Sequence, residues 1–417
     1  MRTSLYLTTA LLVSAFALAA APPPVAAQGA QPDANAEGPL RPYRIEIPQS
    51  QLDDLKQRLA MARWPERETV ADDSQGVRRA EIEALTRYWA DGYDWRKVEN
   101  RLNSYPQFVT NIDGVDIHFL WIKSKHPGAT PLIMTHGWPG SVVELLDVIE
   151  PLTDPTRHGA KASDAFHLVL PSIPGHGFSG KPEGTGWGRH RVARAWGTLM
   201  TRLGYERYVA QGGDWGAVIT QAMGEQAPPG LQGIHVNMPA VVPKTPPASL
   251  SADEQRAMDA LNAFFTKGAG YAQIQGSRPQ TIGYALADSP TGQAAWIYEK
   301  LAAWSDSGGR PETLFTRDQI LDNIMMYWLT NSSASSARFY WENSDLAFYC
   351  VDVKVPVAVS VFPKEIYRAP RSWAEACYPK LAYFNELDKG GHFAAFEQPQ
   401  LFVEELRAAF RSVKAKR

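Results

Sequence analysis

The segment Gly212-Gly213-Asp214-Trp215-Gly216 is the part of the sequence best suited to nucleophilic chemistry. It follows the apolar run 208–212 and precedes the helix-like stretch 217–226, so Asp214 is expected at a sharp turn from a strand into a helix. The glycines are needed because such a turn is strained and too tightly packed for larger residues. A carboxylate presented there can attack an electrophilic carbon and form a covalent ester.

A second motif, His136-Gly137-Trp138-Pro139-Gly140, follows the apolar run 131–135. Its loop can supply a backbone N–H from Trp138, and the turn itself can supply one from Trp215, so that the two form an oxyanion hole. His136 admits two interpretations, a functional residue or a turn histidine with a local structural hydrogen bond.

A nucleophile of this kind needs a general base, and His392 in Gly390-Gly391-His392-Phe393 follows the last predicted strand. The base needs a carboxylate to orient it. Glu365, in the loop after the strand 355–362, competes with Asp388, which lies four residues before the histidine. We favour Glu365, because Asp388 belongs to the segment that carries the histidine and is expected to be solvated. Asn237, after an earlier strand, has no carboxylate to offer.

The choice of aspartate restricts the substrate. Attack on an acyl carbonyl would give an unstable anhydride, whereas attack on a saturated carbon gives an alkyl ester that water can hydrolyse. The electrophile is therefore expected to be an epoxide or a carbon–halogen bond, and the absence of serine at the turn argues against a serine esterase.

The composition is that of a globular protein with a small neutral partner. The 417 residues carry 42 Lys+Arg and 44 Asp+Glu, a formal net charge of -2, and 44% apolar residues. This balance gives no electrostatic reason to bind nucleic acid or an anionic membrane.

Residues 1–27 have the pattern of a secretory signal peptide. Arg2 is followed by an apolar stretch from Leu5 to Ala20 and by a run of small residues and prolines. The stretch is too short to span a bilayer readily, although an uncleaved anchor is the alternative. We expect an exported protein, periplasmic or secreted, with no stable membrane insertion after cleavage. Export would allow a disulfide between Cys350 and Cys377, but two free thiols are equally compatible with the sequence.

Hydrophobic periodicity predicts an α/β fold with a mostly parallel sheet. Helical spacing marks 51–63 and 79–90, and Asp113-Gly114 joins two apolar segments as a hairpin turn. Short apolar runs bounded by glycine or proline then alternate with helix-like stretches, as buried parallel strands do; they are 131–135, 166–173, 208–212, 234–238, 355–362 and 381–384.

The chain is accordingly divided into six segments. They are a signal peptide (1–27), a linker (28–40), a small helical N-terminal domain (41–106), the first part of the α/β core (107–239), a helical cap inserted after the sixth predicted strand (240–346), and the second part of the core (347–417).

From Pro42 onward the chain resembles the microsomal-type epoxide hydrolases of the α/β-hydrolase fold. The N-terminal block from Ile45-Glu-Ile-Pro48 to Arg63-Trp-Pro-Glu66 is similar to that family's N-terminal domain. The motifs His136-Gly-Trp-Pro-Gly-Ser141 and Gly213-Asp-Trp-Gly216 match its oxyanion and nucleophile motifs, and 274–283 matches its cap. The resemblance covers about nine tenths of the chain, and in this family the acid and the base match Glu365 and His392.

The resemblance also implies two cap tyrosines that hydrogen-bond the epoxide oxygen. The matching positions are Tyr271 and Tyr340, which with Trp138 would contact substrate. A phenol keeps its proton at neutral pH and can give it to a forming alkoxide. The aromatic cap suggests bulky aryl or terpenoid-like epoxides.

The leading hypothesis is therefore a cofactor-independent epoxide hydrolase that forms a diol through an ester on Asp214. A haloalkane dehalogenase with the same nucleophile and a non-catalytic secreted binding protein are the alternatives. No histidine or cysteine cluster has metal-binding spacing, and His176 is expected to pack near the site. The sequence is compatible with a homodimer.

Overall fold

A nine-stranded sheet forms the centre of the structure, a computed structural model that describes residues 38–244, 249–346 and 348–416. The order of the strands is β1-β2-β3-β5-β4-β6-β7-β8-β9. Their bounds are β1 Arg41–Pro42, β2 Gln107–Ile112, β3 Val115–Ile122, β4 Thr130–Thr135, β5 Phe166–Pro171, β6 Tyr208–Gly212, β7 Leu231–Val236, β8 Val357–Val361 and β9 Leu381–Glu386.

The sheet is antiparallel at one edge and parallel from β5 to β9. The expected hairpin joins β2 to β3, with Ile112 opposite Val115. Asp113 and Gly114 both have positive φ, 50° and 85°, as a two-residue hairpin turn requires. The parallel strands β4, β6 and β8 are mostly buried, which explains their continuous apolar sequences, whereas the edge strand β9 is only half-buried.

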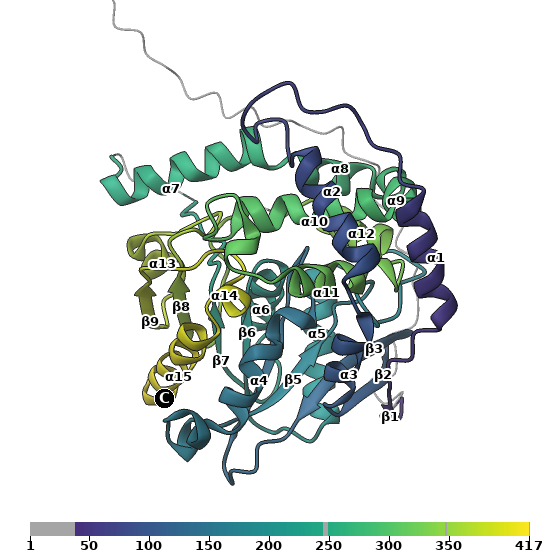
Figure 1. Ribbon diagram of the computed structural model, residues 1–417. Coiled ribbons are helices and arrows are strands. Elements are labelled where there is room, and N and C mark those ends of the chain that lie inside the picture. The colour runs from purple at the N-terminus through teal and green to yellow at the C-terminus, as the bar shows by residue number, and fades with distance from the viewer. Residues whose placement is uncertain (1–37, 245–248, 347, 417) are drawn as a thin grey trace, which may run out of the picture. The chain divides into compact units, whose positions relative to one another are not determined.

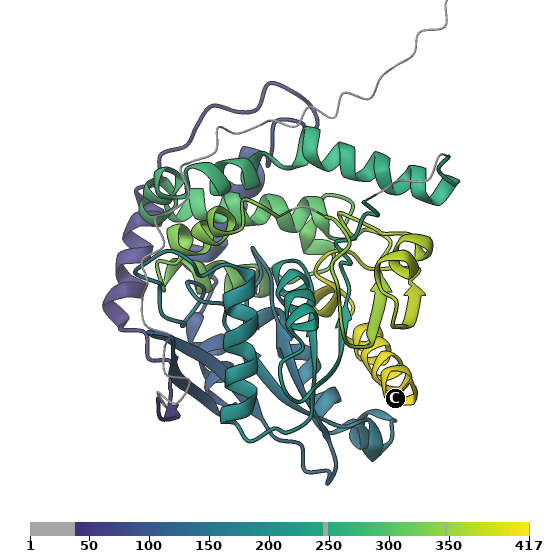
Figure 2. The same ribbon diagram turned by 180° about the vertical axis from the view of Figure 1, so that it is seen from behind.

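Helices cover both faces of this sheet. In Figure 1, α4 and α15 lie in front of the sheet, and Figure 2 shows α5 in front when the molecule is seen from behind, where it packs on α6. The bounds are α4 Leu146–Thr153, α5 Arg189–Arg202, α6 Trp215–Gln226, α13 Arg371–Cys377, α14 Ala394–Glu397 and α15 Pro399–Ala415. This is the α/β arrangement that the alternating sequence predicts, and it agrees with the α/β-hydrolase fold that the family resemblance implies.

The cap is the helical insertion between β7 and β8, and it lies above the carboxyl ends of the parallel strands in Figure 1. It follows the sixth predicted strand, which is the seventh observed one because the two-residue strand β1 was not predicted. Its helices are α7 Ala252–Ala263, a π-helical turn η4 Phe264–Gly268, α8 Gly270–Ser277, α9 Pro279–Asp288, α10 Pro290–Trp304, α11 Arg317–Trp328 and α12 Ser333–Glu342.

Three N-terminal helices pack against the cap, namely α1 Gln49–Ala60, α2 Arg79–Asp91 and α3 Trp95–Asn103. Two phenols tie them to α11: the Tyr88 hydroxyl donates to Asp318 at 2.6 Å and that of Tyr93 to Asp322 at 2.8 Å. Burial raises the pKa of Asp322 to about 7. The described residues from Gly38 onward form one packed unit, so the N-terminal helices are part of the body that carries the site.

The structure answers the open question about the cysteines but does not test the prediction about the N-terminus. The predicted signal peptide, and all but the last three residues of the linker, lie outside the described residues. Cys350 and Cys377 are joined in a disulfide, with their Cα atoms 4.8 Å apart.

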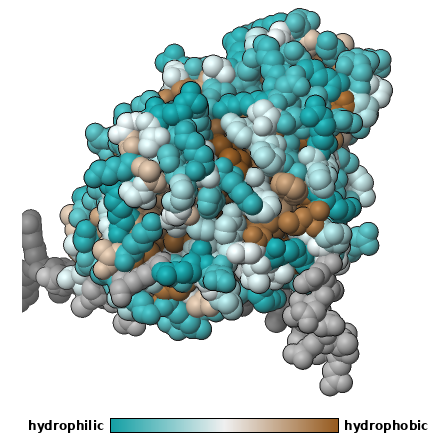
Figure 3. Space-filling model, turned by 90° about the horizontal axis from the view of Figure 1, so that it is seen from below, coloured by the Kyte–Doolittle hydropathy of each residue, from teal (hydrophilic) through white to brown (hydrophobic). Residues whose placement is uncertain are grey.

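Among the described helices, none has the length and apolarity to cross a bilayer. Figure 3 shows a face on which hydrophilic residues predominate, with small hydrophobic groups between them.

Candidate active site

Asp214 occupies the strained turn between β6 and α6, with φ 50° and ψ -128°. The neighbouring glycines make this turn possible. A Cβ on Gly212 would lie 2.1 Å from the Gly216 carbonyl oxygen, and a Cβ on Gly216 would lie 2.0 Å from the Thr135 carbonyl oxygen. Because such a left-handed conformation is costly for a residue with a side chain, it marks a position held for function.

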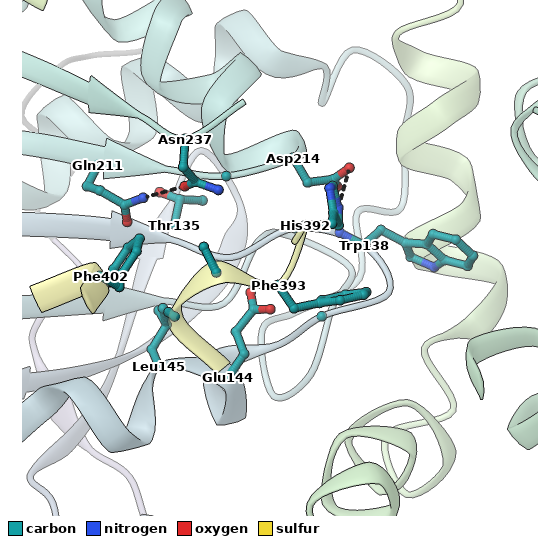
Figure 4. Close-up of a pocket in the computed structure, with 15 residues that line it drawn as sticks. Thr135, Trp138, Glu144, Leu145, Gln211, Asp214, Asn237, His392, Phe393 and Phe402 are labelled. Atoms are coloured by element: carbon teal, nitrogen blue, oxygen red, sulfur yellow. Dashed lines mark hydrogen bonds and ion pairs between the residues drawn. The ribbon is translucent and has the colours of Figure 1, made fainter. Parts of the chain in front are cut away.

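The Asp214 carboxylate lies between the loop after β4 and the histidine after β9. Its Oδ1 accepts a hydrogen bond from the Trp138 N–H at 2.8 Å, and its Oδ2 is 3.4 Å from Nε2 of His392 (Figure 4). Trp215 is the first residue of α6, where N–H groups have no acceptor within the helix. The structure thus places the Trp138 N–H against the nucleophile, and the expected second donor, Trp215, directly follows Asp214 at the start of α6.

His392 is held on its other side by Glu365. The ring Nδ1 is 2.6 Å from Oε1 of Glu365, an oxygen that also accepts the Ile366 N–H at 2.8 Å. Glu365 is buried in the loop after β8, whereas Asp388 is exposed. The structure therefore places against the histidine the carboxylate that the sequence analysis favoured.

Two carboxylates decide the protonation of His392. Burial alone would lower the pKa of its imidazole, but the charge of Glu365 and the hydrogen bonds and charge of Asp214 outweigh burial and hold the pKa well above its usual value. These surroundings therefore favour the imidazolium form of the ring in the free protein.

The two cap tyrosines lie beside each other above the nucleophile. Tyr271 of α8 stacks on the Trp138 ring, with centroids 5.0 Å apart, and Tyr340 of α12 meets the Trp215 ring edge-on at 4.9 Å. The centroids of the two tyrosine rings are 5.7 Å apart, and the buried Tyr340 hydroxyl has no well-aligned hydrogen-bond partner among the residues that the structure describes. Burial is the main cause that raises the pKa of both phenols. The next cause is the charge of Asp214 for Tyr271 and the neighbouring Tyr271 for Tyr340, so both phenols keep their protons.

A small cavity of about 30 Å³ adjoins the nucleophile and His392. At roughly 10–15 Å³ for one water molecule, it has room for about two. The carboxyl group of Glu144, on the short helix η1 (Val142–Leu145), points into this space, as Figure 4 shows. Burial raises the pKa of Glu144 to about 8. The sequence analysis missed Glu144, although a carboxylate between Val142, Val143, Leu145 and Leu146 was an available signal.

Helix α11 fixes the loop that presents the Trp138 N–H. The Asn323 side chain donates to the Pro139 carbonyl at 2.7 Å and accepts from the Ser141 hydroxyl at 2.8 Å. The Tyr327 hydroxyl donates to the Gly140 carbonyl at 2.7 Å. Because these groups come from the cap, the cap and the core jointly position the oxyanion loop.

The two histidines near the site are structural. The Nδ1 of His136 bonds the Gly137 carbonyl at 2.9 Å, its Nε2 accepts the Ile173 N–H at 3.1 Å, and burial lowers its pKa to about 4. His176 is buried beside it, and burial lowers its pKa to about 3. Within the described ranges, no three His, Cys, Asp or Glu side chains form a group that could hold a metal ion.

Known proteins share both the sequence and this fold. Residues 40–145 match the family model described as epoxide hydrolase N terminus, and residues 130–269 match that of the alpha/beta hydrolase fold. The chain is 57% identical to a Stigmatella aurantiaca protein assigned to the epoxide hydrolases, over 90% of this chain and 86% of that protein. It is 36% identical to epoxide hydrolase 1 of Oryctolagus cuniculus, over 91% and 90% of the respective chains.

Two solved structures extend the similarity to three dimensions. The juvenile hormone epoxide hydrolase of Bombyx mori superposes with a TM-score of 0.83 at 32% identity, over 91% of this chain and 95% of that one. The Aspergillus niger epoxide hydrolase superposes with a TM-score of 0.80 at 34% identity, over 90% and 97%.

Proposed function

Because this chain belongs to the epoxide hydrolase family, we propose that it converts an epoxide into a vicinal diol through a covalent ester on Asp214. One observation carries the mechanism: a carboxylate with one oxygen on a backbone N–H and the other beside a histidine lies beneath two protonated phenols. The carboxylate can act as nucleophile while the phenols activate the epoxide oxygen.

Ring opening is the first step. A carboxylate oxygen of Asp214 attacks an epoxide carbon, and the electron pair of the breaking C–O bond moves onto the epoxide oxygen. Tyr271 and Tyr340 donate hydrogen bonds to that oxygen, and one of them gives it a proton and becomes a tyrosinate. The products are a hydroxyalkyl ester and a tyrosinate.

Ester hydrolysis becomes possible because esterification removes the negative charge of Asp214. Esterification removes the negative charge of Asp214, one of the two carboxylates that raise the pKa of His392, so the imidazolium can now release its proton, which returns to the tyrosinate. Neutral His392, oriented by Glu365, then takes a proton from water as the water attacks the ester carbonyl. The Trp138 and Trp215 N–H groups stabilise the tetrahedral oxyanion. On collapse the bond to the substrate oxygen breaks, and that oxygen takes the remaining proton of the attacking water, which leaves the diol and the Asp214 carboxylate.

Glu144 is suited to orient the attacking water. Its carboxyl group faces the cavity beside His392 and Asp214, and with its pKa raised to about 8 by burial it is largely protonated at neutral pH. A protonated carboxyl can both donate to and accept from a water molecule without adding a second negative charge beside Asp214.

The substrate is expected to be a neutral, apolar epoxide. The rings of Trp138, Trp304 and Tyr271 pack against one another above the nucleophile. These surroundings favour bulky aryl or terpenoid-like epoxides, whose apolar surface such rings can cover.

The test is diol formation from styrene oxide by the wild-type protein and by Asp214→Asn, with a bromoalkane assayed in parallel. We expect diol from the wild type and only background from the variant, because an amide is a poor nucleophile. Halide release without diol would support a dehalogenase instead. Neither product, together with thermal stabilisation by epoxides, would support a binding protein.

We also propose that the protein is exported. The signal-peptide pattern of residues 1–27 supports this, and the disulfide between Cys350 and Cys377 is the kind of bond that persists in oxidising compartments.

A further inference from the structure

Lys300 of α10 is a buried cation that the mechanism above does not use. Its side chain is only 7% exposed, and its ammonium group pairs with the carboxylate of the adjacent Glu299. The Nζ atom lies 4.5 Å from the centroid of the Tyr271 ring and 5.4 Å from that of Trp304. Burying an ammonium group is costly, so its position against the site calls for a functional reason.

The ring of Tyr271 lies between this cation and an indole. Trp138 stacks on Tyr271 with an interplanar angle of 7°, and an indole and an ammonium group cannot occupy the same face of the ring. Lys300 therefore covers the opposite face, at a separation typical of cation–π contacts.

Tyr340 has different surroundings. Its ring packs edge-on against the rings of Trp138, Trp215 and Tyr271. The titratable groups that act on it are Tyr271 and Asp214. Those that act on Tyr271 are Asp214, Tyr340 and Glu299, with the ammonium of Lys300 against its face. The two phenols are thus unequal, because among the described residues a cation faces the ring of Tyr271 and none faces that of Tyr340.

We propose that Lys300 makes Tyr271 the tyrosine that gives its proton to the epoxide oxygen, while Tyr340 contributes a hydrogen bond and keeps its proton. This inference rests on the proposed epoxide hydrolysis. Lys300 acts through Tyr271 and is therefore a positioning residue rather than a catalytic one.

The physical reason is the negative charge that forms on Tyr271 when it gives up its proton. When the C–O bond of the epoxide breaks, its electron pair takes the hydroxyl proton of Tyr271, and the remaining negative charge spreads from the phenolate oxygen into the ring. A cation over that ring attracts the tyrosinate much more strongly than the neutral phenol, and the attraction is strengthened by the burial of both side chains. Lys300 therefore stabilises the product of proton transfer more than the starting state, which speeds ring opening. The tyrosinate takes its proton back from His392 before water attacks the ester. The attack of water therefore does not involve this charge, and ester breakdown, when this attack limits it, should be independent of Lys300.

The experiment measures ester formation and ester breakdown separately, by rapid quenching of single turnovers of styrene oxide followed by mass spectrometry of the protein. Lys300→Met, which keeps the length but removes the charge, is expected to slow ester formation roughly 10- to 100-fold and to leave ester breakdown unchanged. Lys300→Arg is expected to restore most of the rate, because it returns the charge.

The same Lys300 substitution in the Tyr271→Phe and Tyr340→Phe variants shows through which tyrosine Lys300 affects ester formation. Lys300→Met should have no further effect on ester formation in Tyr271→Phe, which has no proton to give, and its full effect in Tyr340→Phe. An equal effect in both backgrounds, an arginine variant as slow as the methionine variant, or wild-type ester formation in Lys300→Met would overturn the inference. If the wild type itself forms no ester, the proposed function fails, and that result is distinct from any of these.

Discussion

Asp214 controls the protonation of its neighbours by gaining and losing its charge. In the free protein its carboxylate adds to that of Glu365 in keeping His392 protonated. In the ester that charge is absent, and the same histidine can become a general base. A single residue therefore serves as nucleophile and also switches on the base at the step that needs it.

This account predicts that Asp214→Asn lowers the pKa of His392. The amide has the shape of the ester and lacks the charge, so burial is opposed only by Glu365. In the wild type the imidazolium should persist well above the pH at which an ordinary histidine loses its proton, and in the variant it should deprotonate at lower pH. NMR titration of the His392 ring measures this. An unchanged pKa would mean that Asp214 does not set the charge of the base, and Glu365→Gln is the control that removes the other carboxylate.

The site residues that follow predicted strands could be identified from the sequence alone, whereas the site residues of the cap could not. Asp214 and His392 follow predicted strands, and exposure separates Glu365 from Asp388 as the sequence suggested. Tyr271 entered only through family resemblance, because cap tyrosines have no motif of their own. The role of Lys300 could not be predicted from the sequence, because it depends on a contact with the ring of Tyr271, which lies 29 residues earlier in the cap.

At the scale of elements, α11 links three parts of the molecule. It receives hydrogen bonds from α2 and the segment before α3 through Tyr88 and Tyr93, and it holds the oxyanion loop through Asn323 and Tyr327. The N-terminal helices thus support the cap helix that aims the Trp138 N–H at the nucleophile.

Asn323→Ala should reduce catalysis more than its modest loss of stability would suggest. The substitution removes both hydrogen bonds to the loop and leaves the Pro139 carbonyl without its partner, at a cost of about 1–3 kcal/mol. We expect kcat to fall at least about 10-fold, since the Trp138 N–H is no longer fixed. Kinetics at a temperature where the variant stays folded, with the exposed cap residue Asn262→Ala as control, would test this; an unchanged kcat would refute the positioning role of α11.

Elements with a periodic or continuous apolar pattern were predictable, and the shortest strand was not. The segment 79–90 matches α2 and 208–212 matches β6. Strand β1 has two residues and pairs with β2 across more than sixty positions, so no local pattern marks it. Helix α3 had a usable signal, because Asp94 caps its first turn and Val98 and Leu102 are buried one turn apart.

At the scale of the whole molecule, the disulfide ties the chain leaving the cap to the core. Cys350 lies between α12 and β8, and Cys377, 27 residues later, ends α13. The sequence left this pairing open, because the 4.8 Å separation of the Cα atoms is a property of the tertiary fold.

Breaking this bond should destabilise the folded protein by roughly 3–4 kcal/mol, the loop-closure entropy expected for that spacing. Urea unfolding with and without reductant measures the difference. The double variant Cys350→Ala/Cys377→Ala serves as control and should be insensitive to reductant; equal stability of the reduced and oxidised wild type would refute the prediction.

The central claim, a covalent ester on Asp214, is tested most directly by a single turnover in ¹⁸O-labelled water with the protein in excess over epoxide. If Asp214 supplies the oxygen that enters the diol, the first diol formed should contain no label, and the label should appear in the peptide that carries Asp214. Labelled diol with an unlabelled Asp214 peptide would mean that water attacks the epoxide directly and would contradict the account.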